Sequence, residues 1–188
     1  MKIFILMFFV TVSLFAQNNI HPKEYLSVED KCRFLDSLNK YRRFHGAPES
    51  KYSFEYETIS SIRIATIRKH IKDIGYEQFE MNPRKYLHFN FLEDFSTFNK
   101  FNLPKGISFG WKGECTISIK YNINYYKEKD IVSEIFSLWK NSEDHWKNML
   151  DEDFNQITLS FQYEDGIIIS VLNSFEINNI KDTIVVQK

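Results

Sequence analysis

The sequence predicts an α+β domain, because stretches with helical periodicity come first and alternating strands come last. In the first third of the chain, apolar residues return every three or four positions, as on the buried face of a helix. Later stretches alternate apolar and polar residues, which is typical of half-buried strands. Asp165-Gly166 separates the last two of these stretches and predicts a two-residue β-hairpin turn. The strands should therefore form an antiparallel sheet.

The first predicted helix begins at Ser27, which can act as N-cap with Asp30 three residues later. Gly46 and Pro48 end it. Its apolar face would consist of Val28, Cys32, Leu35 and Leu38.

The second predicted helix covers residues 53–74 and ends at Gly75. The isoleucines that would form its apolar face are Ile59, Ile62, Ile67, Ile71 and Ile74. The charged residues of "RKHIKD" keep its other side in water.

The rest of the chain alternates between loop, strand and helix. Residues 76–111 read as a loop with short elements, because prolines, asparagines and aromatic residues break any period. The predicted strands are 116–124, 157–163 and 167–175, with a helix at 127–139 between the first two. Residues 176–188 would form a tail or an edge strand.

Composition places the chain among ordinary globular domains. Its 188 residues are 43% hydrophobic and 26% charged, with a net charge of −1, so no basic face is available for nucleic acid. Aromatic residues make up 16%, and we expect them in the core and in any cleft.

The N-terminus has the pattern of a secretory signal peptide. Lys2 precedes an uncharged apolar run that ends at Ala16, too short to span a membrane. We expect cleavage after residue 16, a short lead at 17–26 and one domain at 27–175, with no membrane span after cleavage. An extracytoplasmic protein can keep a disulfide, but the sequence leaves open whether Cys32 and Cys115 pair.

The strings "LNKYRRFHG", Gly113-Glu114 and "WKNSEDHWKN", in this order, resemble those of the CAP superfamily, the sperm-coating-protein and pathogenesis-related type of secreted domain, in its compact bacterial form. "LNKYRRFHG" supplies Asn39 and Arg42 of one family motif, and Gly113-Glu114 matches the start of Gly-Glu-Asn. "WKNSEDHWKN" supplies the positions Trp139, Ser142, His145 and Asn148. The resemblance covers about residues 28–175 and implies a three-layer α-β-α sandwich with a cleft over a central antiparallel sheet.

In such a cleft, similar proteins gather two histidines and one or two acids. The resemblance implies that His145, Glu114 and, by position, His88 line it. These three residues would suit Zn²⁺ or another divalent metal. Glu143 is a candidate second acid, and Cys115 stands where the family has Asn.

His145 falls in the first turn of a helix that Ser142 should cap by accepting a backbone N–H. The positive end of the helix dipole would favour a neutral imidazole there, while Glu143 and Asp144 oppose this effect. A histidine with a purely structural role is the alternative. Cys115 is either buried or a thiol in the cleft, where the adjacent carboxylate of Glu114 would raise the pKa of the thiol and lower its reactivity.

Three functions remain open on this basis. The first, which we favour because no nucleophile motif is present, is a binding module for an apolar or peptide-like ligand. The second is a hydrolase that uses a metal or Glu114 as base. The third is an extracellular protein–protein interaction module.

Overall fold

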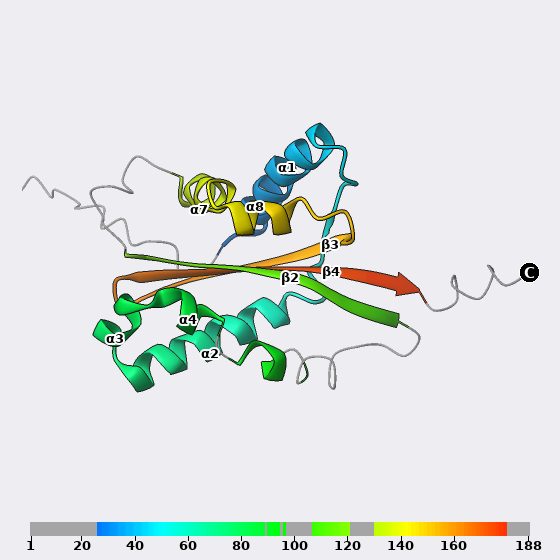
Figure 1. Ribbon diagram of the computed structural model, residues 1–188. Coiled ribbons are helices and arrows are strands. Elements are labelled where there is room, and N and C mark those ends of the chain that lie inside the picture. Colours follow the sequence, from blue (N-terminus) through cyan, green and yellow to red (C-terminus); the bar gives the residue numbers. More distant parts are fainter. Residues whose placement is uncertain (1–25, 89, 95, 97–106, 121–129, 180–188) are drawn as a thin grey trace, which may run out of the picture.

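The computed structural model describes residues 26–88, 90–94, 96, 107–120 and 130–179 and shows a sheet between two helical layers (Figure 1). One face of the sheet is covered by α1 (Val28–Phe44), α7 (Ile131–Lys140) and α8 (Glu143–Met149). The other face is covered by α2 (Thr58–Ile74), α3 (Tyr76–Met81) and α4 (Pro83–Leu87). The predicted α+β sandwich is confirmed.

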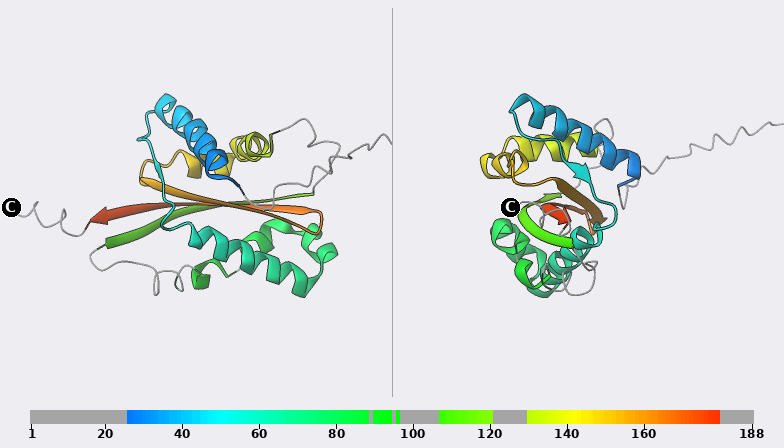
Figure 2. Two further views of the ribbon diagram at one scale, coloured as in Figure 1. Left: turned by 180° about the vertical axis from the view of Figure 1, so that it is seen from behind. Right: turned by 90° about the vertical axis from the view of Figure 1, so that its right-hand side faces the viewer.

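The described sheet has four strands in the order β1-β3-β4-β2. They are β1 (Lys51–Tyr52), β2 (Ile107–Lys120), β3 (Gln156–Glu164) and β4 (Ile167–Asn179). All neighbours pair antiparallel except β1, which runs parallel to β3 over two residues. Asp165 and Gly166 both have positive φ, 52° and 78°, as the tight turn predicted between β3 and β4 requires. In the right-hand view of Figure 2, β1 and β2 lie at opposite edges of the sheet.

Helix α1 begins as predicted, and half of its predicted apolar face is buried. Ser27 Oγ accepts a hydrogen bond from Asp30 N (3.1 Å), and Asp30 Oδ2 accepts one from Ser27 N (3.0 Å). Leu38 is buried and Leu35 half-buried, whereas Val28 and Cys32 are exposed, contrary to prediction. The helix also buries polar side chains, which bond to buried backbone groups: Asn39 and Arg42.

The two helical layers bury cores of different character. Between α1, α7 and the sheet, aromatic rings pack edge to face, with Phe34 at 5.4 Å from Phe136 and 5.8 Å from Trp139. On the α2 side the aliphatic residues Ile64, Ile67 and Ile71 pack on β4. This second layer also buries several polar side chains, and they position the site described below.

Several predicted boundaries were wrong. Helix α2 begins at Thr58 rather than 53, because Ser53 N donates to Ile157 O (2.9 Å) and so extends the β1 contact. Strand β2 begins at Ile107, inside the segment read as loop, and α7 begins at Ile131 after the N-cap Asp130. Residues 121–129, which include parts of the predicted strand and helix, lie outside the described residues.

Cys32 is exposed, Cys115 is buried and both are free, so these two thiols do not pair in the structure. The described helices include none that is long and apolar enough to cross a membrane. The predicted signal peptide, most of the lead and residues 180–188 of the tail lie outside the described residues and stay predictions.

Candidate functional site

A pocket of about 580 Å³ lies along the outer side of β2, between α4 on one face of the sheet and α8 on the other. It is lined by Pro83, Arg84, Leu87, His88, Glu114, Thr116, Ile117, Ser118, Ser142, Asp144, His145 and Asn148. The three residues predicted for the cleft, His88, Glu114 and His145, therefore line the same pocket. They come from the end of α4, from β2 and from the first turn of α8.

Glu114 is held in place by a buried arginine. Its side chain is 2% exposed, and Arg63 of α2 donates from Nε to Oε2 (2.7 Å) and from Nη2 to Oε1 (3.2 Å). His88 Nδ1 lies 3.1 Å from Oε1 of the same carboxylate. Both oxygens of Glu114 thus have a cationic or imidazole partner, which compensates for the burial of the carboxylate.

Arg63 also binds a second acid, Asp94, at 2.6 Å, and donates to Leu87 O. Burial alone would lower the pKa of Arg63, but its hydrogen bonds with Glu114 and Asp94 raise the pKa overall. Thr66 Oγ1 donates to the other oxygen of Asp94 (2.9 Å). The second acid near the site is therefore Asp94.

Sequence reasoning missed Arg63 and Asp94. Ile59, Arg63 and Ile67 follow one another in steps of four on α2, and all three are completely buried. An arginine on an apolar stripe was the available signal, because such a residue needs buried partners. Asp94 lies in a segment without periodicity and gave no comparable signal.

His145 is half-buried in the first turn of α8. Burial lowers its pKa, the nearby charge of His88 lowers it further, and Asp144 opposes both effects. The imidazole is therefore favoured in its neutral form, a balance that the sequence left open between the helix dipole and the two acids. Ser142 occupies the N-cap position, yet its side chain makes no capping hydrogen bond, contrary to prediction; it lines the pocket instead.

Two residues predicted for the cleft do not line the pocket. Glu143 is exposed on α8. Cys115 is completely buried on the opposite face of β2, within the aromatic core, where its Sγ lies 3.7 Å from His145 O. Burial raises the pKa of this thiol, and Glu114 raises it further, so Cys115 is a packed core residue rather than a nucleophile.

The family-motif residues position the pocket walls. Arg42 donates to the carbonyl oxygens of Pro48, Met149, Asp151 and Phe154, which fixes the segment between α8 and β3. Asn39 exchanges hydrogen bonds of 2.9 Å with the backbone of Ser50, and Trp139 is buried in the core.

The Asn148 side chain packs against the backbone of Gly113. The side-chain amide of Asn148 lies directly over Gly113, so a Cβ at residue 113 would overlap it. Ser174 Oγ donates to Asn148 Oδ1 (3.3 Å) and to Gly113 O (3.2 Å), which holds α8 against β2. A side chain at residue 113 would therefore force the Asn148 amide to move.

The arrangement does not assemble a metal centre as it stands. Zn²⁺ in proteins takes three or four nitrogen, sulfur or oxygen ligands from the chain. Across the described ranges, no three His, Cys, Asp or Glu side chains are placed to hold one ion. Zn²⁺ at Glu114 would compete with the hydrogen bonds from Arg63, and the implied zinc site stays a prediction.

The outer surface of the pocket is crossed by one ion pair. Arg84 of α4 and Asp144 of α8 meet at 2.9 Å, with side chains 83% and 73% exposed. His45 is exposed and His70 packs against Tyr86, away from the pocket, whereas His21 lies outside the described residues.

Comparison with known structures gives matches of low identity. They include an outer surface protein from Borrelia burgdorferi (12% identity, TM-score 0.44, covering 82% of this chain and 98% of that one). A cysteine-rich secretory protein from Staphylococcus aureus shows 13% identity and a TM-score of 0.44 over 78% of this chain. An extracellular protein with an SCP domain from Bacillus anthracis shows 18% identity and a TM-score of 0.42 over 77%. The matched regions span only 38% and 40% of the last two proteins.

Curated protein sequences give no significant match. The model of the CAP family, described as the cysteine-rich secretory protein family, matches residues 35–169. This range is well over half of the 188 residues and contains both the Arg42 motif and the His145 motif. The chain belongs to the CAP family.

Proposed function

We propose that the protein is a secreted binding module that holds a neutral ligand in the pocket between α4, α8 and β2. The observation that carries the proposal is the convergence of His88, Glu114 and His145 on one pocket of about 580 Å³. This volume is within the range of small-molecule and peptide sites, roughly 300–1,000 Å³. The proposal of secretion rests on the family and on the signal-peptide pattern of residues 1–16.

The state of the charged groups favours binding over catalysis. Glu114 would be the general base of a hydrolase, but Arg63 donates to both of its oxygens. Both carboxylate oxygens are therefore already engaged inside the protein, and the side chain is only 2% exposed. Cys115 is buried away from the pocket, and Ser142 is not paired with His145 by any hydrogen bond among the described residues.

His88 and His145 provide the polar contacts for a ligand. The neutral imidazole of His145 can donate from one ring nitrogen and accept at the other, and Thr116, Ser118 and Asn148 add further groups of both kinds. Leu87 and Ile117 provide apolar surface. Such a lining suits a ligand that is uncharged but rich in hydrogen-bonding groups.

Native mass spectrometry of protein recovered from its producing cells tests this function. We expect a retained ligand that is lost in His145→Ala and kept in the matched control His45→Ala, since His45 is exposed and outside the pocket. Retention in both variants would place the ligand elsewhere. Reproducible hydrolysis of a peptide or polymer, abolished by Glu114→Gln in a folded protein, would replace the proposal with an enzymatic one.

Metal is not needed for this function. The predicted zinc site is tested by calorimetric titration of Zn²⁺ into wild type and His145→Ala. Equal heats would remove His145 from any such site.

A further inference from the structure

The pocket runs beside backbone groups of β2 that point away from the sheet, and their identity follows from the pairing register. On β3, Leu159 N donates to Tyr52 Oη (3.1 Å) and Leu159 O accepts from it (2.8 Å), so these backbone groups face the β1 side. Residues alternate along a strand, so Thr158 and Ser160 face β4. Their partners on β4 are Asn173 and Val171.

The same alternation carries over to β2. Since Asn173 and Val171 direct their backbone groups to β3, Leu172 and Ser170 direct theirs to β2. Leu172 and Ser170 pair with Cys115 and Ile117. The backbone N–H and C=O groups of Glu114, Thr116 and Ser118 therefore point outward, and in the described sheet β2 has no neighbour on that side.

These outward groups lie along a continuous groove. The pocket of about 580 Å³ follows Glu114, Thr116, Ile117 and Ser118. A second pocket of about 360 Å³ shares His88, Glu114 and Asn148 with it and continues to Trp111. From Trp111 to Ser118 there are seven residue steps, or about 23 Å at roughly 3.3 Å per residue in a strand. A groove of this length, with the β-bulge between Trp111 and Gly113 near one end, fits an extended chain.

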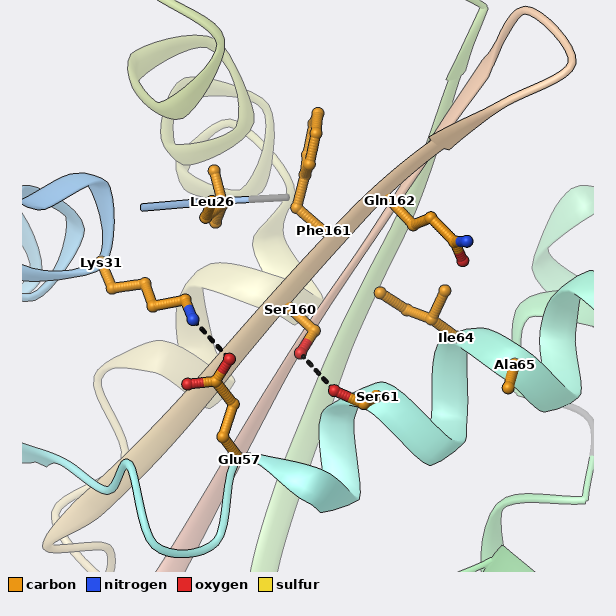
Figure 3. A pocket seen from close by; sticks show the side chains of 9 residues that line it. All are labelled: Leu26, Lys31, Glu57, Ser61, Ile64, Ala65, Ser160, Phe161 and Gln162. Atoms are coloured by element: carbon orange, nitrogen blue, oxygen red, sulfur yellow. Dashed lines mark hydrogen bonds and ion pairs between the residues drawn. The ribbon is translucent and has the colours of Figure 1, made fainter. Parts of the chain in front are cut away.

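The opposite edge of the sheet shows how this protein treats a strand edge that it closes. There β1 pairs with Gln156 and Ile157, and the Tyr52 hydroxyl group satisfies Leu159. Next to it, Lys31 of α1 and Glu57 before α2 form an ion pair beside β3, within a smaller pocket of about 270 Å³ (Figure 3). An edge that is left unpaired is a template for strand addition.

We propose that the ligand of the pocket is an extended peptide that adds a strand to the outer edge of β2 and pairs with the backbone of Glu114, Thr116 and Ser118. This inference rests on the proposed function and specifies its ligand class. Side chains of the peptide alternate between the α4 wall and the α8 wall. The side chains that face these walls are neutral, because the acids of the pocket already have cationic partners: Glu114 is paired with Arg63, and Asp144 with Arg84.

The far end of the groove selects an apolar side chain. Phe91 and Trp111 are in contact, with ring centroids 4.3 Å apart and ring planes tilted by 42°, and both line the second pocket. Aromatic surfaces of this kind favour apolar or aromatic partners. The preferred peptide therefore has neutral residues facing Glu114 to Ser118 and one large apolar residue near Trp111.

The test begins with a random heptapeptide library displayed on phage and selected against the wild-type protein. The tightest peptide is then synthesised with single N-methyl groups at each position in turn. Backbone pairing predicts that methylation weakens binding at every second residue by more than about tenfold and leaves the alternate residues nearly unchanged. Equal effects of methylation at neighbouring residues would overturn the inference, and so would a selection that yields no binding peptide.

Two variants locate the bound peptide on β2. Ser118→Pro removes one outward N–H without removing a bond to β4, and a proline is tolerated at such a position of an edge strand. We expect binding to weaken about threefold to tenfold, whereas the matched control Ser118→Ala keeps the N–H and the affinity. If Ser118→Pro binds as tightly as wild type, the peptide does not pair with β2. Should that variant fail to fold, the methylation pattern on wild-type protein still decides.

Failure of this inference is distinct from failure of the proposed function. If no peptide is selected but a lipid or other small molecule is retained by wild type and lost in His145→Ala, the pocket is a binding site with a different ligand. If neither a peptide nor a retained ligand is found, both proposals fall.

Discussion

The two edges of the sheet are both spanned by an ion pair between the helical layers, but the two pairs differ in their surroundings. At the β3 edge, Lys31 and Glu57 have side chains only 11% and 25% exposed. At the β2 edge, Arg84 and Asp144 are 83% and 73% exposed. Tyr52 also closes the β3 edge, and burial raises the pKa of its hydroxyl group, so this hydroxyl stays protonated and can donate to Leu159 O.

The buried ion pair at the β3 edge contributes more to stability than the exposed pair at the β2 edge, where part of the strand edge borders a pocket. Side chains of α1, β1 and the start of α2 cover the edge of β3 as far as Leu159, and the smaller pocket follows β3 from Ser160 to Gln162. At β2, polar side chains stand on both sides of the edge and leave its backbone groups facing a pocket. Because unpaired strand edges invite other chains, natural proteins cover them unless they are used. Lys31→Met and Arg84→Met each remove the ion pair at one edge, whereas Arg63→Met and His145→Gln change the groups beside the pocket.

The largest effect is expected from Arg63→Met. This change leaves Glu114 and Asp94 buried without their shared cation, and breaking a buried ion pair in this way costs about 3–5 kcal/mol. Urea denaturation measures the loss. The control Arg43→Met removes an exposed ion pair with Glu49 and should cost less than about 1 kcal/mol. Similar costs for the two variants would contradict the role given to Arg63.

Opening the closed edge should have the next largest effect. In Lys31→Met, Glu57 loses a largely buried partner, and a hydrogen bond to a charged group contributes about 1.5–3 kcal/mol. Urea denaturation should show a lower midpoint with an unchanged slope. A stability equal to that of wild type would mean that the pair does not hold the β3 edge.

Acid should weaken the protein through His145. Burial makes the pKa of this residue lower in the folded protein than in the unfolded chain, so the unfolded chain binds more protons as the pH falls through about 6.5. Stability is therefore lost below that pH and restored above it. His145→Gln should lose less stability than wild type between pH 7 and pH 5 in urea titrations. The same relief from the exposed-site variant His45→Gln would show that His145 is not responsible.

The smallest effect on stability is expected from Arg84→Met. Its ion pair with Asp144 is exposed at both ends, so its loss should change the free energy of unfolding by less than about 1 kcal/mol. The comparison with Lys31→Met is direct, because each variant removes one lysine or arginine that spans an edge. A cost for Arg84→Met as large as that for Lys31→Met would mean that both edges are closed alike.

The sequence predicted the fold class and the hairpin, because these depend on local periodicity and turn chemistry. Family strings pointed to Glu114 and His145, and His88 followed by position alone; all three line one pocket, while their role there stays a prediction. It did not predict the burial of Arg63 and Asp94, since their partners lie far away along the chain. The same reason applies to α1, where Arg42 is buried because the carbonyl oxygens of Met149, Asp151 and Phe154 surround it. Nor did the sequence place Cys115, because a residue of β2 can face either side until its register with β4 is known.

Amide hydrogen exchange followed by NMR tests the central contrast between the edges most directly. In the free protein, the Leu159 amide, which donates to Tyr52 Oη, should exchange slowly, whereas the outward amide of the half-buried Ser118 should exchange rapidly. Addition of a ligand that occupies the pocket should slow exchange at Ser118 and leave Leu159 unchanged. Protection of Ser118 equal to that of Leu159 in the ligand-free protein would contradict the account, because the edge of β2 would then already be closed.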